Sequence, residues 1–373
     1  MIVLVYLIPV ITCLILLLFF RAYTVWWEYL VVLLPSLMFS SMLYFGILNV
    51  KMMDTEYLSY YVTKVEHYED WNEWVHQTCT RTWTDSKGNT HTETYDCSHS
   101  VYHPDHWEMY LNNDDDISYT IYEDYYDSIV KKFGKKPQFV DLHRSYFTLD
   151  GDMYVCTFDG NRNKLWPITF SNKYKNKILG SKSIFNFSEV SKKEKEENGL
   201  YDYPAVKLYD QEPILAENFK IPTAVVDSFK YLNAIYGYQY KFRVYVMIFL
   251  NKERNVAKLQ QDYFVGGNLN ELLVCIGVDD SSRVNWVESF SWEDEPVISV
   301  GVNHLYHSGE PLKLLKLNRY LIQNVPEKWV KKSKKDFEYI SVDADSKTWT
   351  WILILTVILN IVISVYVIKN EFS

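Results

Sequence analysis

Three long apolar runs lie near the two ends of the chain, and the nearly three hundred residues between the second and the third contain no other long apolar run. The first run covers residues 2–20 without a charged residue, which gives a helix of about 28 Å. The second covers residues 29–49 and the third residues 349–368. The pattern predicts three transmembrane helices: a hairpin within residues 1–50 and a C-terminal anchor. A signal peptide is the alternative for the first run, but no basic stretch precedes it and no small-residue cleavage site follows it.

Almost all of the polar sequence, from Lys51 to Ser346, lies between the second and third runs. Arg21 and Lys369 flank the short segments that the positive-inside rule weighs most, and they favour a large region outside the cytoplasm. The lysine cluster at 331–335 argues for the opposite orientation. That cluster lies about fifteen residues before the third run, at the limit of the rule's range, so we expect a multi-pass membrane protein whose large region is extracytoplasmic.

The middle region predicts an α+β fold in two parts. Residues 51–190 read as a subdomain rich in aromatic residues, histidines and β-hairpins, with a helix over 122–134. Residues 200–346 read as a β-α-β-β subdomain, with continuous apolar strands over 242–250 and 271–279. The charged stretch 191–199 is interpreted as a solvated loop between them.

The second subdomain is also predicted to contain two helices and a third strand. A helix over 256–265 separates the two apolar strands, and residues 284–292 alternate as a half-buried strand. Residues 313–325 have apolar positions at helical spacing and would cover the sheet. The two buried strands on either side of a helix predict a partly parallel sheet covered on both faces.

A hairpin is also predicted over residues 57–111, with turn residues at 85–89. Pairing residues whose numbers sum to 176 places Cys79 opposite Cys97 and Trp83 opposite Glu93. A disulfide there would stabilise the fold by about 3 kcal/mol in the chain-entropy model. The bond requires an oxidising compartment, which agrees with the expected orientation.

Histidines concentrate in the same hairpin, where His99, His103 and His106 follow Cys97. Thiolate and imidazole groups are zinc ligands, but the spacing matches no CxxC or helical zinc pattern. A structural disulfide with surface histidines is therefore the favoured interpretation. We expect no cofactor, with a divalent metal ion as the alternative.

Two further groups could line a ligand site. Gly266, Gly267, Asn268, Asn270 and Glu271 form a turn between a helix and a buried strand, where glycines permit close backbone approach to an anion. The alternative is a helix C-cap with a tight turn. Asp279 and Asp280 follow the next strand, and we interpret them either as residues of a ligand site or as ordinary turn residues.

Composition narrows the function classes. The formal charge of -9 argues against a nucleic-acid partner. The hydrophobic content of 48% excludes a disordered chain. The 31 tyrosines and 12 tryptophans suit a surface that recognises a protein partner, although core and membrane-belt roles would use the same residues.

Two sequence blocks, residues 61–107 with HPDHW and residues 260–292 with QQDYFVGGNLNELLVCIGVDD, resemble a family of uncharacterised multi-span membrane proteins of bacteria and large tailed bacteriophages. That resemblance implies the anchor arrangement and no activity. The β-α-β-β order is also similar to membrane-anchored TPM-domain proteins, which are linked to phosphatase activity.

The function that we expect is therefore interaction or structure at the cell envelope, in contact with the lipid bilayer and an unidentified protein partner. No Walker, Rossmann or zincin signature is present to indicate an enzyme. The alternative is a TPM-like, metal-dependent phosphohydrolase, with the turn at 266–271 and Asp279 and Asp280 near its site. A channel fits poorly because the apolar runs lack ionisable residues.

Overall fold

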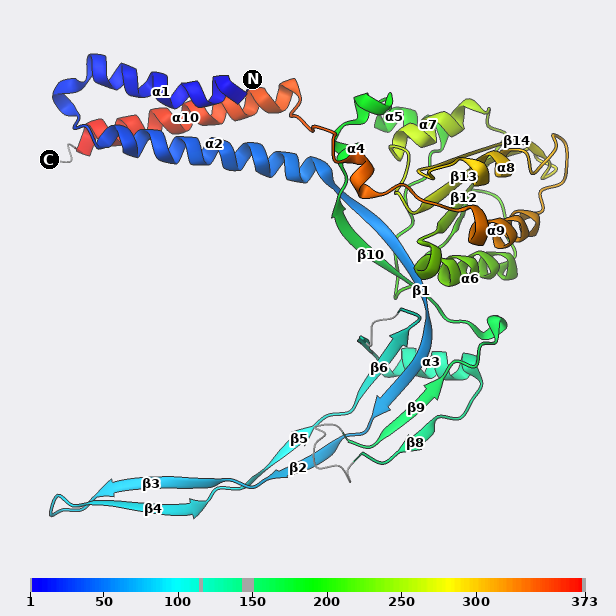
Figure 1. Cartoon of the computed structure of the whole chain (residues 1–373), viewed down its shortest axis with the longest axis horizontal. Coiled ribbons are helices and arrows are strands. Elements are labelled where there is room, and N and C mark those ends of the chain that lie inside the picture. Colours follow the sequence, from blue (N-terminus) through cyan, green and yellow to red (C-terminus); the bar gives the residue numbers. More distant parts are fainter. Residues whose placement is uncertain (1, 114–116, 143–150, 371–373) are drawn as a thin grey trace.

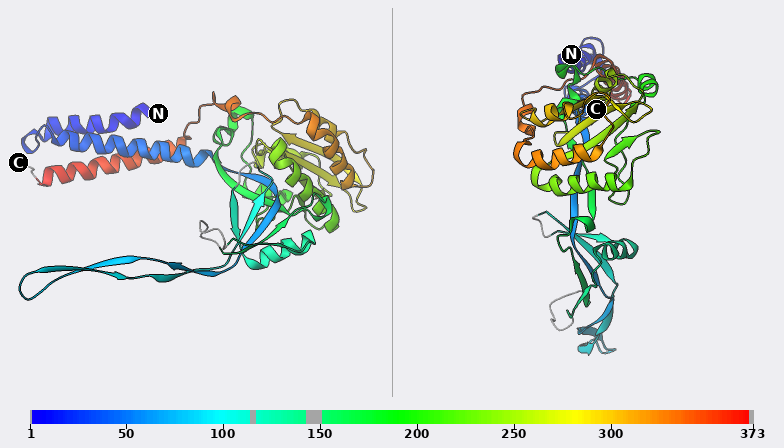
Figure 2. Two further views of the ribbon diagram at one scale, coloured as in Figure 1. Left: turned by 60° about the horizontal axis from the view of Figure 1, so that its bottom comes forward. Right: turned by 90° about the vertical axis from the view of Figure 1, so that its right-hand side faces the viewer.

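The computed structural model describes residues 2–113, 117–142 and 151–370. Three long helices lie side by side at one end of the molecule (Figure 1). They lead into two β-sheets with covering helices, from which a narrow two-stranded arm projects (Figures 1 and 2). The first helix begins and the last helix ends at opposite ends of the helical bundle (Figure 1).

The bundle consists of α1 (Ile2–Phe19), α2 (Glu28–Met52) and α10 (Ser346–Asn370). Helices α2 and α10 are long and apolar enough to cross a membrane. Helix α1 is a shorter apolar helix by the same measure, so two of the three expected spans have membrane length.

Small polar groups lie inside this bundle and apolar side chains cover its outside. The hydroxyls of Ser40 and Thr356 lie 3.1 Å apart between α2 and α10. The outward side chains of Met38, Phe45 and Val362 are exposed. This distribution is typical of helices that pack in lipid, because no hydrophobic force drives lipid-facing residues inward.

The first sheet is built on β1 (Met53–Tyr68), which begins directly after α2. The first half of β1 pairs with β10 (Pro167–Lys175), and its second half pairs with β6 (His106–Leu111) and β9 (Met153–Thr157), all antiparallel. The strand order is β7-β6-β1-β9-β8. The outer strands are β7 (Ser118–Ile121) and β8 (Gln138–Val140).

Helix α3 (Glu123–Phe133) covers this sheet and ends at Gly134, as the sequence predicted. Gly134 has a φ of 68°, the left-handed conformation that favours glycine at a helix end. Ile129 and Phe133 pack on Val62 and Val65 of β1, and all four are buried.

The second sheet has the order β11-β12-β13-β14. Its strands are β11 (Ile214–Ala216), β12 (Arg243–Leu250), β13 (Glu271–Val278) and β14 (Val284–Ser291). The first three are parallel and β14 is antiparallel. Helix α7 (Asn255–Tyr263) connects β12 to β13, so the predicted β-α-β-β order and the partly parallel sheet are confirmed.

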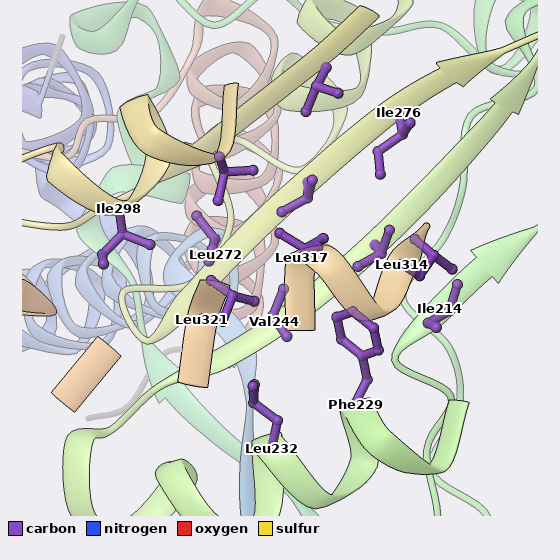
Figure 3. Close-up of a cluster of buried hydrophobic side chains, with 14 of the residues drawn as sticks. Ile214, Phe229, Leu232, Val244, Leu272, Ile276, Ile298, Leu314, Leu317 and Leu321 are labelled. Carbon is purple, nitrogen blue, oxygen red and sulfur yellow. The ribbon is translucent and has the colours of Figure 1, made fainter. Parts of the chain in front are cut away.

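Both faces of this sheet are covered because alternate side chains of β12 and β13 point to opposite sides. Helices α6 (Thr223–Tyr240), α8 (Val297–Asn303) and α9 (Leu314–Lys328) cover one face, whose buried side chains Figure 3 shows. Helix α7 and the segment 200–203 cover the other face.

The two sheets meet at a buried arginine. Arg243, at the start of β12, is only 1% exposed, and its guanidinium donates to the hydroxyls of Ser59 on β1 and Thr169 on β10. It also donates to the side-chain oxygen of Gln211 and lies over the ring of Tyr245. The contact therefore joins strands of both sheets through one charged group.

A second set of polar contacts lies beside it. Asn270 donates to the carbonyl oxygen of Tyr57 at 2.9 Å, and Asn268 donates to that of Thr55 at 3.1 Å. Helix α6 also approaches β1 closely, because a methyl group at Gly237 would overlap the carbonyl of Ser59. The relative position of the two sheets is thus fixed by specific hydrogen bonds and by close backbone contact.

The structure corrects the interpretation of residues 191–199. Residues Lys192–Asn198 form helix α5, with a capping box between Ser191 and Glu194. Each side chain bonds the other residue's backbone N–H, which favours a helix start. The remaining short elements are η1 (Arg21–Tyr23), η2 (Arg162–Lys164), α4 (Lys177–Gly180), η3 (Lys182–Phe185) and η4 (Lys334–Phe337).

We expect Arg243→Met to lower the free energy of unfolding by about 3 kcal/mol, because it leaves buried partners without their donor. Thermal unfolding of the purified full chain, followed by circular dichroism, measures the change. Arg254→Met is the matched control, since the Arg254 side chain is 66% exposed in its ion pair with Glu288. Equal losses of stability in the two variants would contradict this role of Arg243.

Candidate functional site

The arm is one long β-hairpin. Strand β2 (Trp71–Val75) pairs with β5 (His99–His103), and β3 (Thr78–Thr84) pairs with β4 (Thr90–Asp96). The register is the same as that between β1 and β6, from Lys64 opposite Tyr110 to Thr84 opposite Thr90. The arm therefore continues the first sheet outward and leaves both of its faces open (Figure 2).

The structure corrects the expected register of this hairpin. Cys79 lies opposite Tyr95, and Trp83 lies opposite His91 rather than Glu93. Cys79 and Cys97 nevertheless form a disulfide across the two strands, with their Cα atoms 5.8 Å apart. The bond therefore joins diagonal positions of the ladder.

A five-residue loop, 85–89, accounts for the difference in register. The carboxylate of Asp85 accepts hydrogen bonds from the backbone N–H groups of Lys87 and Asn89, both at 2.9 Å. It also lies 3.0 Å from Nε2 of His91. These contacts lower the pKa of Asp85 to about 2, with the His91 bond as the largest cause.

Two histidines of the arm, His91 and His103, stack on aromatic rings. His103 stacks on Trp71 with ring centroids 5.0 Å apart, and His91 stacks on Trp83 at 5.6 Å. The same pairing recurs at the base of the arm, where the stacked pairs are His106 with Tyr68 and His67 with Trp107. Each pair lies directly across the ladder, so aromatic stacking gives these histidines a structural role.

The proposed zinc ligands are not brought together. His99 and His103 lie four residues apart on β5, a separation of about 13 Å along a strand. His103 also contacts the carboxylate of Glu73 at 2.9 Å, and His106 lies beyond Pro104 on β6. Within residues 2–113, 117–142 and 151–370, no group of three or more His, Cys, Asp or Glu side chains has metal-binding geometry.

The two faces of the arm differ in chemistry, because side chains alternate along each strand. Near the tip, one face of the arm carries three pairs of threonines that lie opposite each other: Thr80 and Thr94, Thr82 and Thr92, and Thr84 and Thr90. The opposite face carries the disulfide and a set of larger side chains, which comprises Arg81, Trp83, His91, Glu93 and Tyr95.

Large aromatic side chains are exposed along the arm. The exposed fractions are 59% for Trp74, 42% for Trp83, 48% for Tyr95 and 58% for Tyr102. A two-stranded ribbon has no core in which to bury them, and exposed aromatic rings mark recognition surfaces. Sequence reasoning placed the aromatic residues in this hairpin region but did not predict which of them are exposed, although threonine alternates with other residues from 78 to 84.

The turn before β13 is part of the protein interior. Gly266 and Gly267 both have a φ of 80° and end the segment after α7, as a helix C-terminal turn requires. Glu271 is fully buried and accepts from the phenol of Tyr203 and from the backbone N–H of Asn268. Burial raises the pKa of Glu271. Asn268 in turn donates to the backbone carbonyl of Thr55 on β1, so this turn is part of the contact between the two sheets.

Asp279 and Asp280 lie at the other end of the same strand. The carboxylate of Asp279 accepts from the backbone N–H groups of Ser281 and Arg283, which closes a turn. Asp280 accepts from the side chain of Asn251 at 2.7 Å. Strand β13 separates the two candidate groups by its full length, so they do not form one site. The phosphohydrolase interpretation stays a prediction.

We expect trypsin to cut the arm at least about tenfold faster in a Cys79→Ser/Cys97→Ser variant, because the disulfide restrains opening of the loop that contains Arg81 and Lys87. Limited proteolysis of the full chain on reducing gels gives the rate. Cys156→Ala, at a buried cysteine of β9, is the control. An unchanged rate at Arg81 and Lys87 would show that the bond does not stabilise the arm.

No family model, curated protein or solved structure matches this chain. The resemblance to bacterial and phage membrane proteins and the similarity to TPM-domain proteins therefore stay predictions. Function has to be inferred from the chemistry of the arm, of the bundle and of the sheets.

Proposed function

We propose that this protein is a membrane-anchored interaction protein that uses the projecting arm to bind a protein partner. The observation that carries the proposal is the exposure of Trp74, Trp83, Tyr95 and Tyr102 on a ribbon with both faces open. Such side chains supply much contact area at a low cost in conformational entropy. Stacked histidines and the disulfide hold the ribbon in one shape before binding, which reduces the entropy lost on association.

We also propose that all three bundle helices insert into the bilayer. Helices α2 and α10 have the length and the apolar surface for this role, and α1 packs along them. Lipid contacts would cover the exposed apolar side chains on the outside of the bundle. The termini would then lie on opposite sides of the membrane.

The arm and the sheets belong outside the cytoplasm in this proposal. Two observations support that side. The Cys79–Cys97 bond persists in an oxidising compartment. Arg21 lies in η1, between α1 and α2, and Lys369 lies in the last turn of α10, so both are at the ends of α2 and α10 that do not connect to the sheets. Positive-inside bias would place them in the cytoplasm.

We expect a membrane-impermeant maleimide to label Cys79 and Cys97 in intact cells only after mild reduction. The test uses a full-length chain in which Cys13, Cys156 and Cys275 are replaced by alanine, so that only the arm can react. A chain that also lacks the two arm cysteines is the control. Labelling without reduction, and only after lysis, would reverse the proposed orientation.

We expect a photo-crosslinking amino acid at Trp83 or Tyr95 to give one discrete protein adduct in cells that naturally carry the protein. The same replacement at Tyr339, which is 76% exposed and lies away from the arm, is the control. The adduct should weaken when Cys79 and Cys97 are replaced by serine, because the arm then loses its fixed shape. Absence of an adduct at both arm positions, or an equal adduct at Tyr339, would contradict the proposed role of the arm.

A further inference from the structure

A cavity of about 750 Å³ lies on the first sheet, away from the arm. Residues from the start of α3, the end of β7, strand β10 and the segment 206–209 line it, and it is open to solvent on one side. Its aromatic lining consists of Tyr122, Tyr125, Trp166, Phe170 and Tyr209. The volume falls within the range of small-molecule sites, which is about 300–1,000 Å³.

The aromatic walls hold one another in place. Trp166 donates its indole N–H to the phenol oxygen of Tyr125 at 2.8 Å, and the two rings meet edge to face. Tyr209 packs against both Tyr125 and Phe170, with ring centroids 5.8 and 5.4 Å away. The side chains of Tyr125, Trp166, Phe170 and Tyr209 are therefore held in place before a ligand binds, as is usual for ligand sites.

Backbone strain contributes to this arrangement. Leu208 and Tyr209 have φ angles of 45° and 64°, which non-glycine residues adopt at a cost of order 1 kcal/mol or more each. The backbone carbonyl of Tyr209 accepts from the N–H of Thr169 at 2.7 Å, which fixes the strained segment on β10.

One lining residue carries a charge. Asp124, in the first turn of α3, is the only acidic or basic side chain among the residues that line the cavity. Burial raises the pKa of Tyr125 to about 12, so that wall is neutral at physiological pH. The lining of the cavity thus combines aromatic side chains with one carboxylate.

One of these rings, that of Trp166, already makes a cation–π contact within the protein. Nζ of Lys132 lies over the ring of Trp166 at 5.3 Å, and over the ring of Tyr231 at the same distance. Lys132 does not line this cavity but the adjoining one, of about 370 Å³. The indole of Trp166 therefore contacts the ammonium group of Lys132 in the smaller cavity and also lines the larger one.

We propose that the aromatic cavity binds a quaternary ammonium group, with Asp124 as its counter-charge. Aromatic ring faces attract cations electrostatically. A primary ammonium group needs about three hydrogen-bond acceptors, whereas a quaternary one donates no hydrogen bonds and fits a lining that is largely aromatic. The remaining volume would hold the body of the ligand.

Isothermal titration of the full chain in a nonionic detergent tests the proposal with choline and with its neutral isostere, 3,3-dimethyl-1-butanol. We expect choline to bind at least about tenfold more tightly than the isostere. Asp124→Asn should weaken choline binding by about fivefold and leave the isostere unaffected. Asp127→Asn, on the same helix but outside the cavity, should leave both affinities unchanged.

A second ligand distinguishes the source of the ammonium group. Tighter binding of an Nε-trimethyllysine amide than of choline would assign the cavity to a modified protein side chain, and the reverse would assign it to a small molecule. Equal affinities for choline and its isostere, or no binding of choline at millimolar concentrations, would overturn the proposal. Thermal unfolding of Asp124→Asn checks that a loss of binding does not come from a loss of fold.

Discussion

Strand β1 forms ladders with three other strands, and these ladders fix the positions of the bundle, the first sheet and the arm. It follows α2 without a loop, so the strand takes its direction from the helix. Its last residues continue in one register into the arm. A slip of one residue would turn Val62 and Val65 out of the core, because side chains alternate along a strand. The buried residues of the first sheet thereby also determine where the arm begins.

The second sheet depends on β1 in a different way. Arg243 places a buried charge beside the side chains of Ser59, Thr169, Gln211 and Tyr245, and it interacts electrostatically with the buried carboxylate of Glu271 on the neighbouring strand. A buried charge is costly unless several partners satisfy it together, so few arrangements of the two sheets are acceptable. Apolar contacts alone would allow the sheets to slide past each other. The polar contact therefore specifies geometry more than it adds stability.

The sequence could predict those parts of the fold that depend on local periodicity. The parallel pair β12 and β13, the helix that ends at Gly134 and the helix over 314–328 follow from runs of apolar residues and helix-stop signals. Helix α5 was readable too, because Ser191 and Glu194 have the spacing of a capping box.

Other features depend on contacts that spacing does not encode. The hairpin register was misjudged by assuming that bonded cysteines face each other directly, whereas the disulfide is diagonal. The interior role of Arg243 rests on residues distant in sequence, such as Ser59 and Gln211. The aromatic cavity likewise collects side chains from α3, β10 and the segment 206–209, which only the fold brings together.

The arm and the helical bundle extend from the sheets towards the same side (Figures 1 and 2). The arm carries Arg81, Asp85 and Glu93, and charged groups do not enter hydrocarbon at low cost. Where the bundle crosses a bilayer, the arm has to bend at a point without ladder pairs, such as the one between Tyr68–His106 and Trp71–His103. Pro104 lies at that point and has no N–H to donate. A bent arm would lie along the lipid headgroups, so it would contact proteins in the same membrane.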